Sequence, residues 1–246
     1  MGGLAHFFEE EGLPTTQISL IREHTETIRP PRALWVPFEL GRPLGVPGDA
    51  AFQSRVLLAT LKLLEVSTGP VIEDYPEEAP VHQDEDAVWA CPVDLAQEKT
   101  DLGGIEQLRE ALRLEMMQLR PWYDLAVKEH ARTTVGASGL GLDTLGDFIG
   151  SFLGGELPEN PREGIPLGMV LKFAVDDLKA FYTEAATAQP GALPPGSNVL
   201  ANWFWSETVA GKALLTIKDL CIKNEDKVLQ LVGNMLIVPM ARTPGG

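Results

Sequence analysis

The side chains best placed to bind a small anion are two arginines and a histidine near the start of the chain. Arg22 and His24 follow a short β-rich run at residues 16–21, and Arg42 follows a second run at residues 33–38. In parallel α/β layers, ligands bind beyond the carboxyl ends of the strands, and a guanidinium there can hold a carboxylate through paired hydrogen bonds. We therefore expect a ligand site where Arg22, His24 and Arg42 converge. The alternative is a solvated loop whose arginines pair with acidic residues.

Cys91 is the candidate nucleophile. It lies in the segment VWACPVDL near a predicted loop, whereas Cys221 lies in an apolar helical segment and is expected to be an inert buried thiol. A reactive thiolate needs a nearby cation or helix N-terminus that lowers its pKa. The neighbours Asp94 and Glu98 are acidic and oppose this effect, so the alternative is an unreactive thiol.

Motifs for nucleotide, zinc or serine-hydrolase chemistry are absent from the sequence. The segment GASGLG at residues 136–141 lacks the lysine of a phosphate-binding loop, and we interpret it as a flexible turn between helices. His82 lies beside Asp84, Glu85 and Asp86, but this spacing is not that of a defined metal site, and a solvated acidic loop is expected. We predict no metal site and no cofactor.

The composition excludes several classes of partner. The 246 residues carry a formal charge of −15, and 44% of them are hydrophobic. Nucleic acids and anionic membranes attract basic surfaces, so neither is an expected partner. No apolar run approaches the roughly 20 residues of a membrane-spanning helix, and the start of the chain lacks the features of a signal peptide. Two cysteines make no disulfide framework, and we expect a cytoplasmic protein.

Residues 1–70 are predicted to form a small parallel α/β layer. A helix at residues 23–28 separates the two β-rich runs and must end before Pro30, because a residue that precedes a proline is pushed toward extended conformations. Asp49 is a good N-cap for a helix with an apolar face over residues 52–64. Two apolar strands that alternate with helices predict a small Rossmann- or flavodoxin-like parallel sheet.

The remainder of the chain is predicted to be a connection followed by helices. Residues 71–99 are rich in Pro, Glu and Asp, and we interpret them as an acidic connecting segment. Residues 100–246 show helical spacing of apolar side chains. This mainly helical region either stands alone or packs on the first as one unit. One helix is expected over residues 199–211, and its adjacent aromatic side chains are assigned to the core.

Four segments in the first quarter of the chain carry a family resemblance: EEEGLPTTQISL, IRPPRALWVPF, GRPLGVPGD and the predicted helix at residues 52–65. Two later segments, LRPWYDLAVKEHARTTVG and NWFWSETVAG, share it. Together they resemble the selenoprotein B subunits of glycine, sarcosine and betaine reductases and D-proline reductase. These are scaffold motifs rather than catalytic signatures, so they indicate ancestry better than activity.

The resemblance implies reductive cleavage of the carbon–nitrogen bond of glycine, its N-methyl derivatives or proline. In that family a thiolate or selenolate attacks the α-carbon, while a pyruvoyl group on a partner subunit activates the amine. The family's reactive motif precedes the glycine-rich helix that matches residues 2–12, so that role falls on no residue of this chain. Either the chain is a natural relative without the thiol, or its gene continues upstream through an in-frame selenocysteine codon. Both alternatives stay open.

By resemblance, the chain is an amino-acid reductase-like protein that supplies a scaffold, and arginines that hold a small amino-acid-like ligand. The thiol would come from an upstream segment or from another chain. The alternative is a non-catalytic binding or assembly subunit that kept the fold. The family places a further strand before the helix that matches residues 2–12. We expect the sheet edge left without that strand to be covered by the helical region or by a second chain, and we favour a dimer. The second chain would be either a partner subunit or a second copy in a homodimer.

Overall fold

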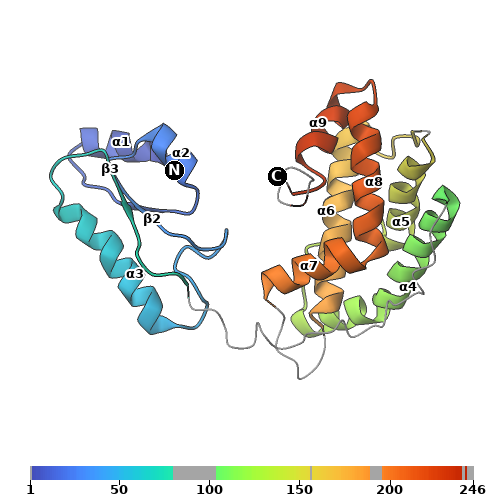
Figure 1. Cartoon of the computed structure of the whole chain (residues 1–246), viewed down its shortest axis with the longest axis horizontal. Helices are drawn as coiled ribbons and strands as arrows, with labels where there is room; N and C mark the ends of the chain where they lie inside the picture. Colours follow the sequence, from blue (N-terminus) through green and yellow to red (C-terminus); the bar gives the residue numbers. More distant parts are fainter. Residues whose placement is uncertain (1, 80–103, 156, 189–195, 240–241, 243–246) are drawn as a thin grey trace. The chain divides into compact units, whose positions relative to one another are not determined.

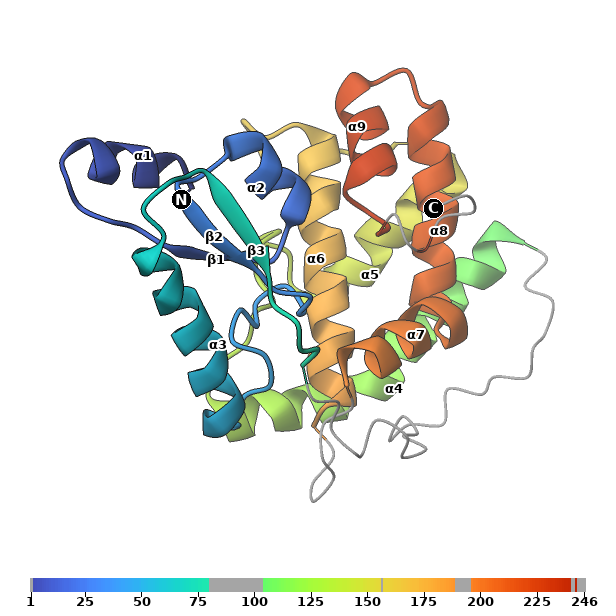
Figure 2. The same ribbon diagram turned by 60° about the vertical axis from the view of Figure 1, so that its left-hand side comes forward.

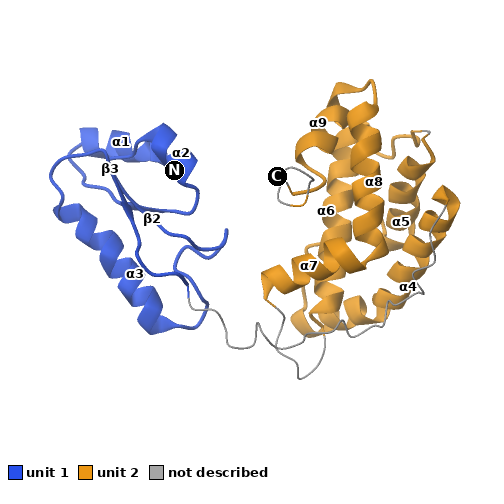
Figure 3. Ribbon diagram, in the orientation of Figure 1, with its two compact units in different colours: residues 1–83 blue, residues 84–246 orange. Residues whose placement is uncertain are grey.

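The computed structural model divides the chain into two compact units, Met1–Gln83 and Asp84–Gly246 (Figure 3). Each unit has its own hydrophobic core. The residues that the structure describes are 2–79, 104–155, 157–188, 196–239 and 242. Within these ranges, no helix combines the length and the apolar character that crossing a membrane requires.

The first unit is built on a three-stranded parallel sheet (Figure 1). The strands are β1 (Gln17–Ser19), β2 (Arg32–Trp35) and β3 (Val71–Asp74), in the order β1-β2-β3. In the register, Ser19 lies beside Trp35 and Trp35 beside Asp74. The predicted parallel pairing of the two β-rich runs is confirmed.

Helices cover both faces of this sheet. They are α1 (Gly2–Glu10), α2 (Arg22–Ile28) and α3 (Ala50–Lys62), which continues as the 3-10 turn η1 (Leu63–Glu65). The helix α2 ends ahead of Pro30, as predicted. The predicted N-cap of α3 is also confirmed, because the Asp49 carboxylate accepts a hydrogen bond from the Phe52 N–H at 2.9 Å.

The two faces of the sheet differ in how they are packed. The helix α3 packs Phe52 and Val56 against Leu34 of β2 in the core of the first unit. On the other face the Ser19 hydroxyl is hydrogen-bonded to the Thr25 hydroxyl of α2. The helices α1 and α2 lie together in Figure 2, while α3 lies on the opposite side of the sheet. The first strand and its neighbours are thereby enclosed by helices on either face.

The predicted boundary at residue 70 is too early. We interpreted residues 71–99 as a connection, but Val71–Asp74 forms β3 and pairs with β2. The acidic residues Glu73 and Asp74 led us to assign this segment to the connection. Both are exposed at one edge of the sheet. Residues 80–99 of the predicted connection lie outside the described residues.

The regular elements of the second unit are all helices within its described residues. Its helices surround α6, which contacts α4, α5, α7 and α9 (Figure 1). Pro121 lies inside α4, and the helix continues past it. The elements are α4 (Ile105–His130), α5 (Leu142–Ser151), η3 (Phe152–Gly154), α6 (Leu167–Ala186), α7 (Ser197–Glu207), α8 (Val209–Lys223) and α9 (Lys227–Met235).

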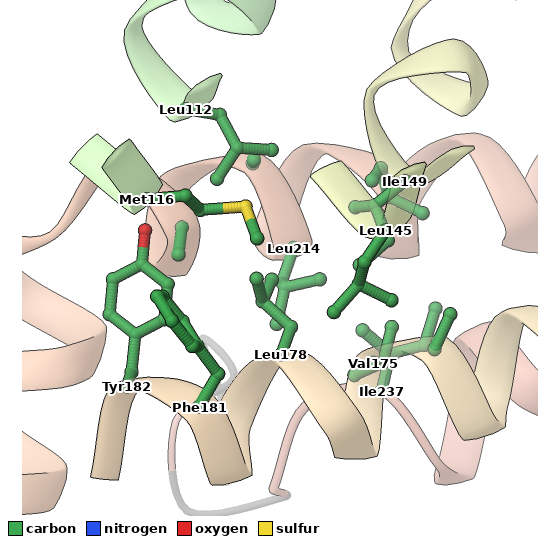
Figure 4. Close-up of a cluster of buried hydrophobic side chains, with 14 of the residues drawn as sticks. Leu112, Met116, Leu145, Ile149, Val175, Leu178, Phe181, Tyr182, Leu214 and Ile237 are labelled. Atoms are coloured by element: carbon green, nitrogen blue, oxygen red, sulfur yellow. The ribbon is translucent and has the colours of Figure 1, made fainter. Parts of the chain in front are cut away.

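The core of the second unit is centred on α6. Figure 4 shows Leu178 of this helix with Met116 of α4, Leu145 of α5 and Leu214 of α8. Leu178 is fully buried. Four helices therefore depend on one apolar cluster, and the helical spacing predicted within residues 100–246 is confirmed for α6.

The predicted helix at residues 199–211 is two helices. Thr208 separates them: its hydroxyl donates to the Phe204 carbonyl at 2.6 Å and accepts from the Gly211 N–H at 2.9 Å. A Cβ atom on Gly211 would lie 2.3 Å from the Phe204 carbonyl oxygen, so the close turn requires glycine. The assignment of Trp203 and Phe204 to the core is confirmed.

Glu115 of α4 is a buried acid that joins three helices. Its carboxylate accepts hydrogen bonds from the Tyr182 hydroxyl at 2.6 Å and from the N–H groups of Val209 and Ala210 at 2.8 and 3.0 Å. It thus satisfies backbone donors at the beginning of α8, where the helix dipole favours negative charge. Burial raises the pKa of Glu115 above 4.5, and these hydrogen bonds only partly oppose it.

We expect Glu115→Gln to change how stability depends on pH. The raised pKa means that the folded protein binds this proton more tightly than the unfolded chain does. The contribution of Glu115 to stability is therefore fully present below its ordinary pKa and is lost as the pH rises through its folded-state pKa. Urea unfolding of both proteins at several pH values measures this, and the stability of wild type relative to the variant should fall with rising pH. A difference that grows with pH would contradict the assignment.

We expect Leu178→Ala to reduce the free energy of unfolding of the second unit by about 2–5 kcal/mol, because the truncation leaves a cavity in a fully packed core. Leu231→Ala is the matched control, since Leu231 of α9 is 49% exposed. Its effect should stay within about 0.5 kcal/mol. Denaturant unfolding followed by helical circular dichroism measures both. Equal effects of the two substitutions would be incompatible with the proposed core.

Candidate functional site

Arg22 lies where ligands bind in parallel α/β layers, but internal acids already engage its charge. It begins α2, directly after β1, and its guanidinium carbon lies 5.4 Å from the Trp35 ring centroid at the end of β2. It pairs with Glu26 at 2.8 Å and with Asp74 at the end of β3. The hydrogen bond to Asp74 is the largest cause of a raised pKa for Arg22. One arginine thus links the carboxyl ends of all three strands.

Arg42 and His24 are both exposed near the same end of the sheet. Arg42 lies in the loop after β2 and pairs with Glu39 at 3.4 Å. His24 lies on α2 and lines a hollow that neither arginine lines. The structure therefore does not gather Arg22, His24 and Arg42 around that hollow. Arg22 and Arg42 instead pair with acidic residues, as in the alternative interpretation of a solvated loop.

The hollow runs along β1 and has a volume of about 630 Å³. The helix α1 contributes Leu4 and Phe8, α2 contributes His24, and Leu40 comes from the loop after β2. Its polar groups include the hydroxyls of Ser19 and Thr25, which bond to each other. No Asp, Glu, Lys or Arg among the described residues lines it. Such a lining suits an apolar group far better than the charged carboxylate that we predicted.

An ion pair at the amino end of the sheet was not predicted. Arg32 of β2 pairs with Glu9 of α1 at 2.7 Å and donates to the Val66 carbonyl at 2.8 Å. Glu9 also accepts from the N–H and hydroxyl of Thr15, and the backbone hydrogen bond is the largest cause of its lowered pKa. Arg32 is buried. The motifs EEEGLPTTQISL and IRPPRALWVPF thus contribute residues that fasten α1 to the sheet.

The glycine-rich segment at residues 136–141 is not a flexible turn. Its Gly136, Ala137 and Ser138 N–H groups donate to the Asp177 carboxylate of α6 at 2.8, 2.9 and 2.9 Å. The Ser138 hydroxyl donates to the same carboxylate at 2.5 Å. Arg162 donates to the carbonyls of Ala137 and Ser138 at 3.1 and 3.2 Å. A cradle of this kind binds anions, and here an internal carboxylate fills it.

A second acid of α6 holds the neighbouring part of this loop. Glu184 accepts from the hydroxyl of Thr133 at 2.8 Å and from the N–H and hydroxyl of Thr134, both at 2.7 Å. Asp177 and Glu184 lie seven residues apart, two turns along one face of the helix. The end of the motif LRPWYDLAVKEHARTTVG thus anchors a loop to α6. No feature of that motif predicted that its loop would bind Asp177 and Glu184.

The reactive side chains give no catalytic cluster in the described residues. Cys221 of α8 is buried, as predicted, and desolvation raises the pKa of its thiol to about 11, which disfavours a reactive thiolate. Lys179 of α6 donates to the Ile237 carbonyl at 2.5 Å, and burial lowers its pKa. Cys91 and the acidic run beside His82 lie outside the described residues. Within the described ranges, no three of the His, Cys, Asp and Glu residues come together to hold a metal ion.

Comparison of the chain with protein-family models, curated proteins and solved structures found no match.

We expect Asp177→Asn to destabilise the second unit by about 2 kcal/mol at neutral pH, because a buried acceptor of charge-assisted hydrogen bonds is replaced by a neutral amide. Desolvation opposes ionisation of Asp177, but the hydrogen bonds from Ser138, Gly136 and Ala137 outweigh it and lower its pKa. The contribution of the Asp177 carboxylate to stability is therefore fully present at pH values above its ordinary pKa of 3.8. This contribution is lost as the pH falls through the folded-state pKa of Asp177.

Asp176→Asn is the matched control for this substitution. Asp176 is the adjacent residue, but its side chain is 40% exposed and pairs with Lys172. Unfolding experiments from pH 7 down to pH 3 should show that the Asp177→Asn defect shrinks with acidification, while the control stays close to wild type. Equal behaviour of the two variants would show that the carboxylate does not hold the loop.

Proposed function

We propose that this chain is a scaffold subunit related to the amino-acid reductases. Those enzymes cleave the carbon–nitrogen bond of glycine, its N-methyl derivatives or proline. The nucleophilic thiol or selenol would act from another polypeptide segment or chain. The observation that carries this proposal is the internal use of reactive groups within the described residues: Arg22 and Arg42 pair with acids, and Cys221 is buried with a raised pKa. The proposed location is the cytoplasm.

The proposed architecture of the first unit is a small Rossmann- or flavodoxin-like layer. It is supported by parallel strands in the order β1-β2-β3 and by helices against both faces. In such a layer the carboxyl ends of the strands form the ligand side. The Arg22 guanidinium lies there, and a small amino-acid-like ligand would exchange its carboxylate for Glu26 or Asp74. This exchange is feasible because both ion pairs are exposed and therefore weakly held.

The second candidate function is a binding or assembly subunit without a catalytic role. The hollow beside β1 favours it, because its lining is uncharged and includes exposed apolar side chains. In this case the first unit would offer an apolar surface instead of a carboxylate site. The two candidates differ in one measurable property, which is the affinity for a small amino acid.

We expect the purified chain alone not to release amine from glycine, sarcosine, betaine or D-proline in the presence of a dithiol. Cys91→Ala and Cys221→Ala are assayed beside it, with Cys221 as the buried reference thiol. Turnover that disappears only in Cys91→Ala would make Cys91 the nucleophile and overturn the scaffold proposal. Turnover that survives both substitutions would require chemistry from other side chains.

Calorimetric titration with glycine and D-proline separates the two candidate functions. The reductase-related proposal expects binding that weakens at least tenfold in Arg22→Ala or Arg42→Ala, because a charge-assisted contact to the ligand carboxylate is lost. Arg113→Ala is the control, since Arg113 is a surface arginine of α4 that pairs with Glu110. Absence of binding in the wild-type chain would favour the assembly subunit.

A further inference from the structure

Within the described residues, no strand pairs with the outer edge of β1, and the hydrogen-bonding groups of that edge can be assigned. Ser19 lies beside Trp35 in the register, and its carbonyl accepts from the Val36 N–H at 2.9 Å. In a parallel ladder, the groups of alternate residues point to the same side. Gln17 and Ser19 therefore bond to β2, whereas the N–H and C=O of Ile18 point away from it.

Exposed apolar side chains stand around this edge. Leu4 and Phe8 of α1 are 57% and 48% exposed, and Leu40 is 73% exposed. All three line the hollow along β1, together with the continuous stretch of residues 15–21. Soluble proteins cover or blunt such edges, because an unpaired strand beside apolar surface binds another strand. The free edge and the apolar lining thus indicate a strand-pairing surface.

Charge distinguishes among the partners that this surface could bind. The chain has a formal charge of −15, so two copies repel each other, and the faces that meet must not add further contacts between like charges. The described lining contains no acidic or basic residue other than His24. A surface built for a basic partner would present acids here, of which the chain has 35 Asp and Glu residues. The neutral lining therefore fits a second copy of the same acidic chain.

We propose that the free edge of β1 pairs with β1 of a second copy, in antiparallel orientation about a two-fold axis at Ile18. In an antiparallel hydrogen-bonded pair, two residues exchange both N–H···O=C bonds. Both backbone groups of Ile18 point to this side, so Ile18 pairs with Ile18 of the second copy. The edge is its own complement, as a two-fold interface requires, and the two sheets join into one continuous sheet.

The mass of the full chain in solution tests the dimer. Light scattering after size exclusion should give twice the chain mass of 26.7 kDa. Phe8→Glu should raise the dissociation constant at least tenfold, because it places charge in the lining. Leu61→Glu is the matched control on the outer face of α3, where Leu61 is 47% exposed. It should leave the dimer intact. A monomeric wild-type chain, or equal effects of the two substitutions, would overturn the proposal.

Amide hydrogen exchange tests whether β1 edges form the interface. In the dimer, the N–H group of Ile18 should exchange slowly, and it should become fast in Phe8→Glu. The Ser19 N–H bonds to β2 and should stay protected in both proteins, which also shows that the variant remains folded. A dimer with fast exchange at Ile18 would place the interface elsewhere. Slow exchange at Ile18 in a monomer would mean that the chain covers its own edge, and both results contradict the proposal.

Discussion

A carboxylate that is removed from water must find hydrogen-bond donors, and two buried acids and one half-buried acid of this chain find theirs in other parts of the sequence. Asp177 collects the N–H groups of the loop at residues 136–138, and Glu115 collects those at the beginning of α8. Glu9 binds Arg32 and Thr15 in the first unit. An unpaired buried charge would cost several kcal/mol. These acids therefore determine where two loops and two helices can lie.

The same requirement explains why the second unit forms a bundle with a defined arrangement. Apolar packing around Leu178 brings α4, α5, α6 and α8 together but is tolerant of small shifts. The bonds of Glu115 to Tyr182 and to α8 have fixed directions and lengths. They select one position of α8 relative to α4 and α6. Within the described residues, every buried side-chain polar atom has a hydrogen-bond partner.

Internal pairing also limits the chemistry that the first unit offers. Arg22 stacks on Trp35 and pairs with two acids, so it holds the strand ends together at the place where a ligand would bind. Within the described residues, no strand pairs with the outer edge of β1, and apolar side chains surround that edge. These properties support the proposed association at the strand edge and the proposed role as an assembly subunit.

The sequence by itself determined the local elements. Pro30 ended α2, Asp49 began α3, and helical spacing identified the buried face of α6, because these signals act within one or two turns of the chain. The parallel pairing of the first two strands also followed from the helical segment between them. The burial of Cys221 followed from its apolar neighbours.

Only the tertiary structure decided the roles of the charged residues. Arg22 meets Asp74 across 52 positions of sequence, and Asp177 meets Gly136 across 41. No local pattern reports such distances, so an arginine at a strand end resembled a ligand site and a glycine-rich loop resembled a flexible turn. The strand β3 was missed for the same reason, since pairing with β2 rather than its own composition makes it a strand. Local signals fix elements, whereas the partners of a charge depend on how the chain brings them together.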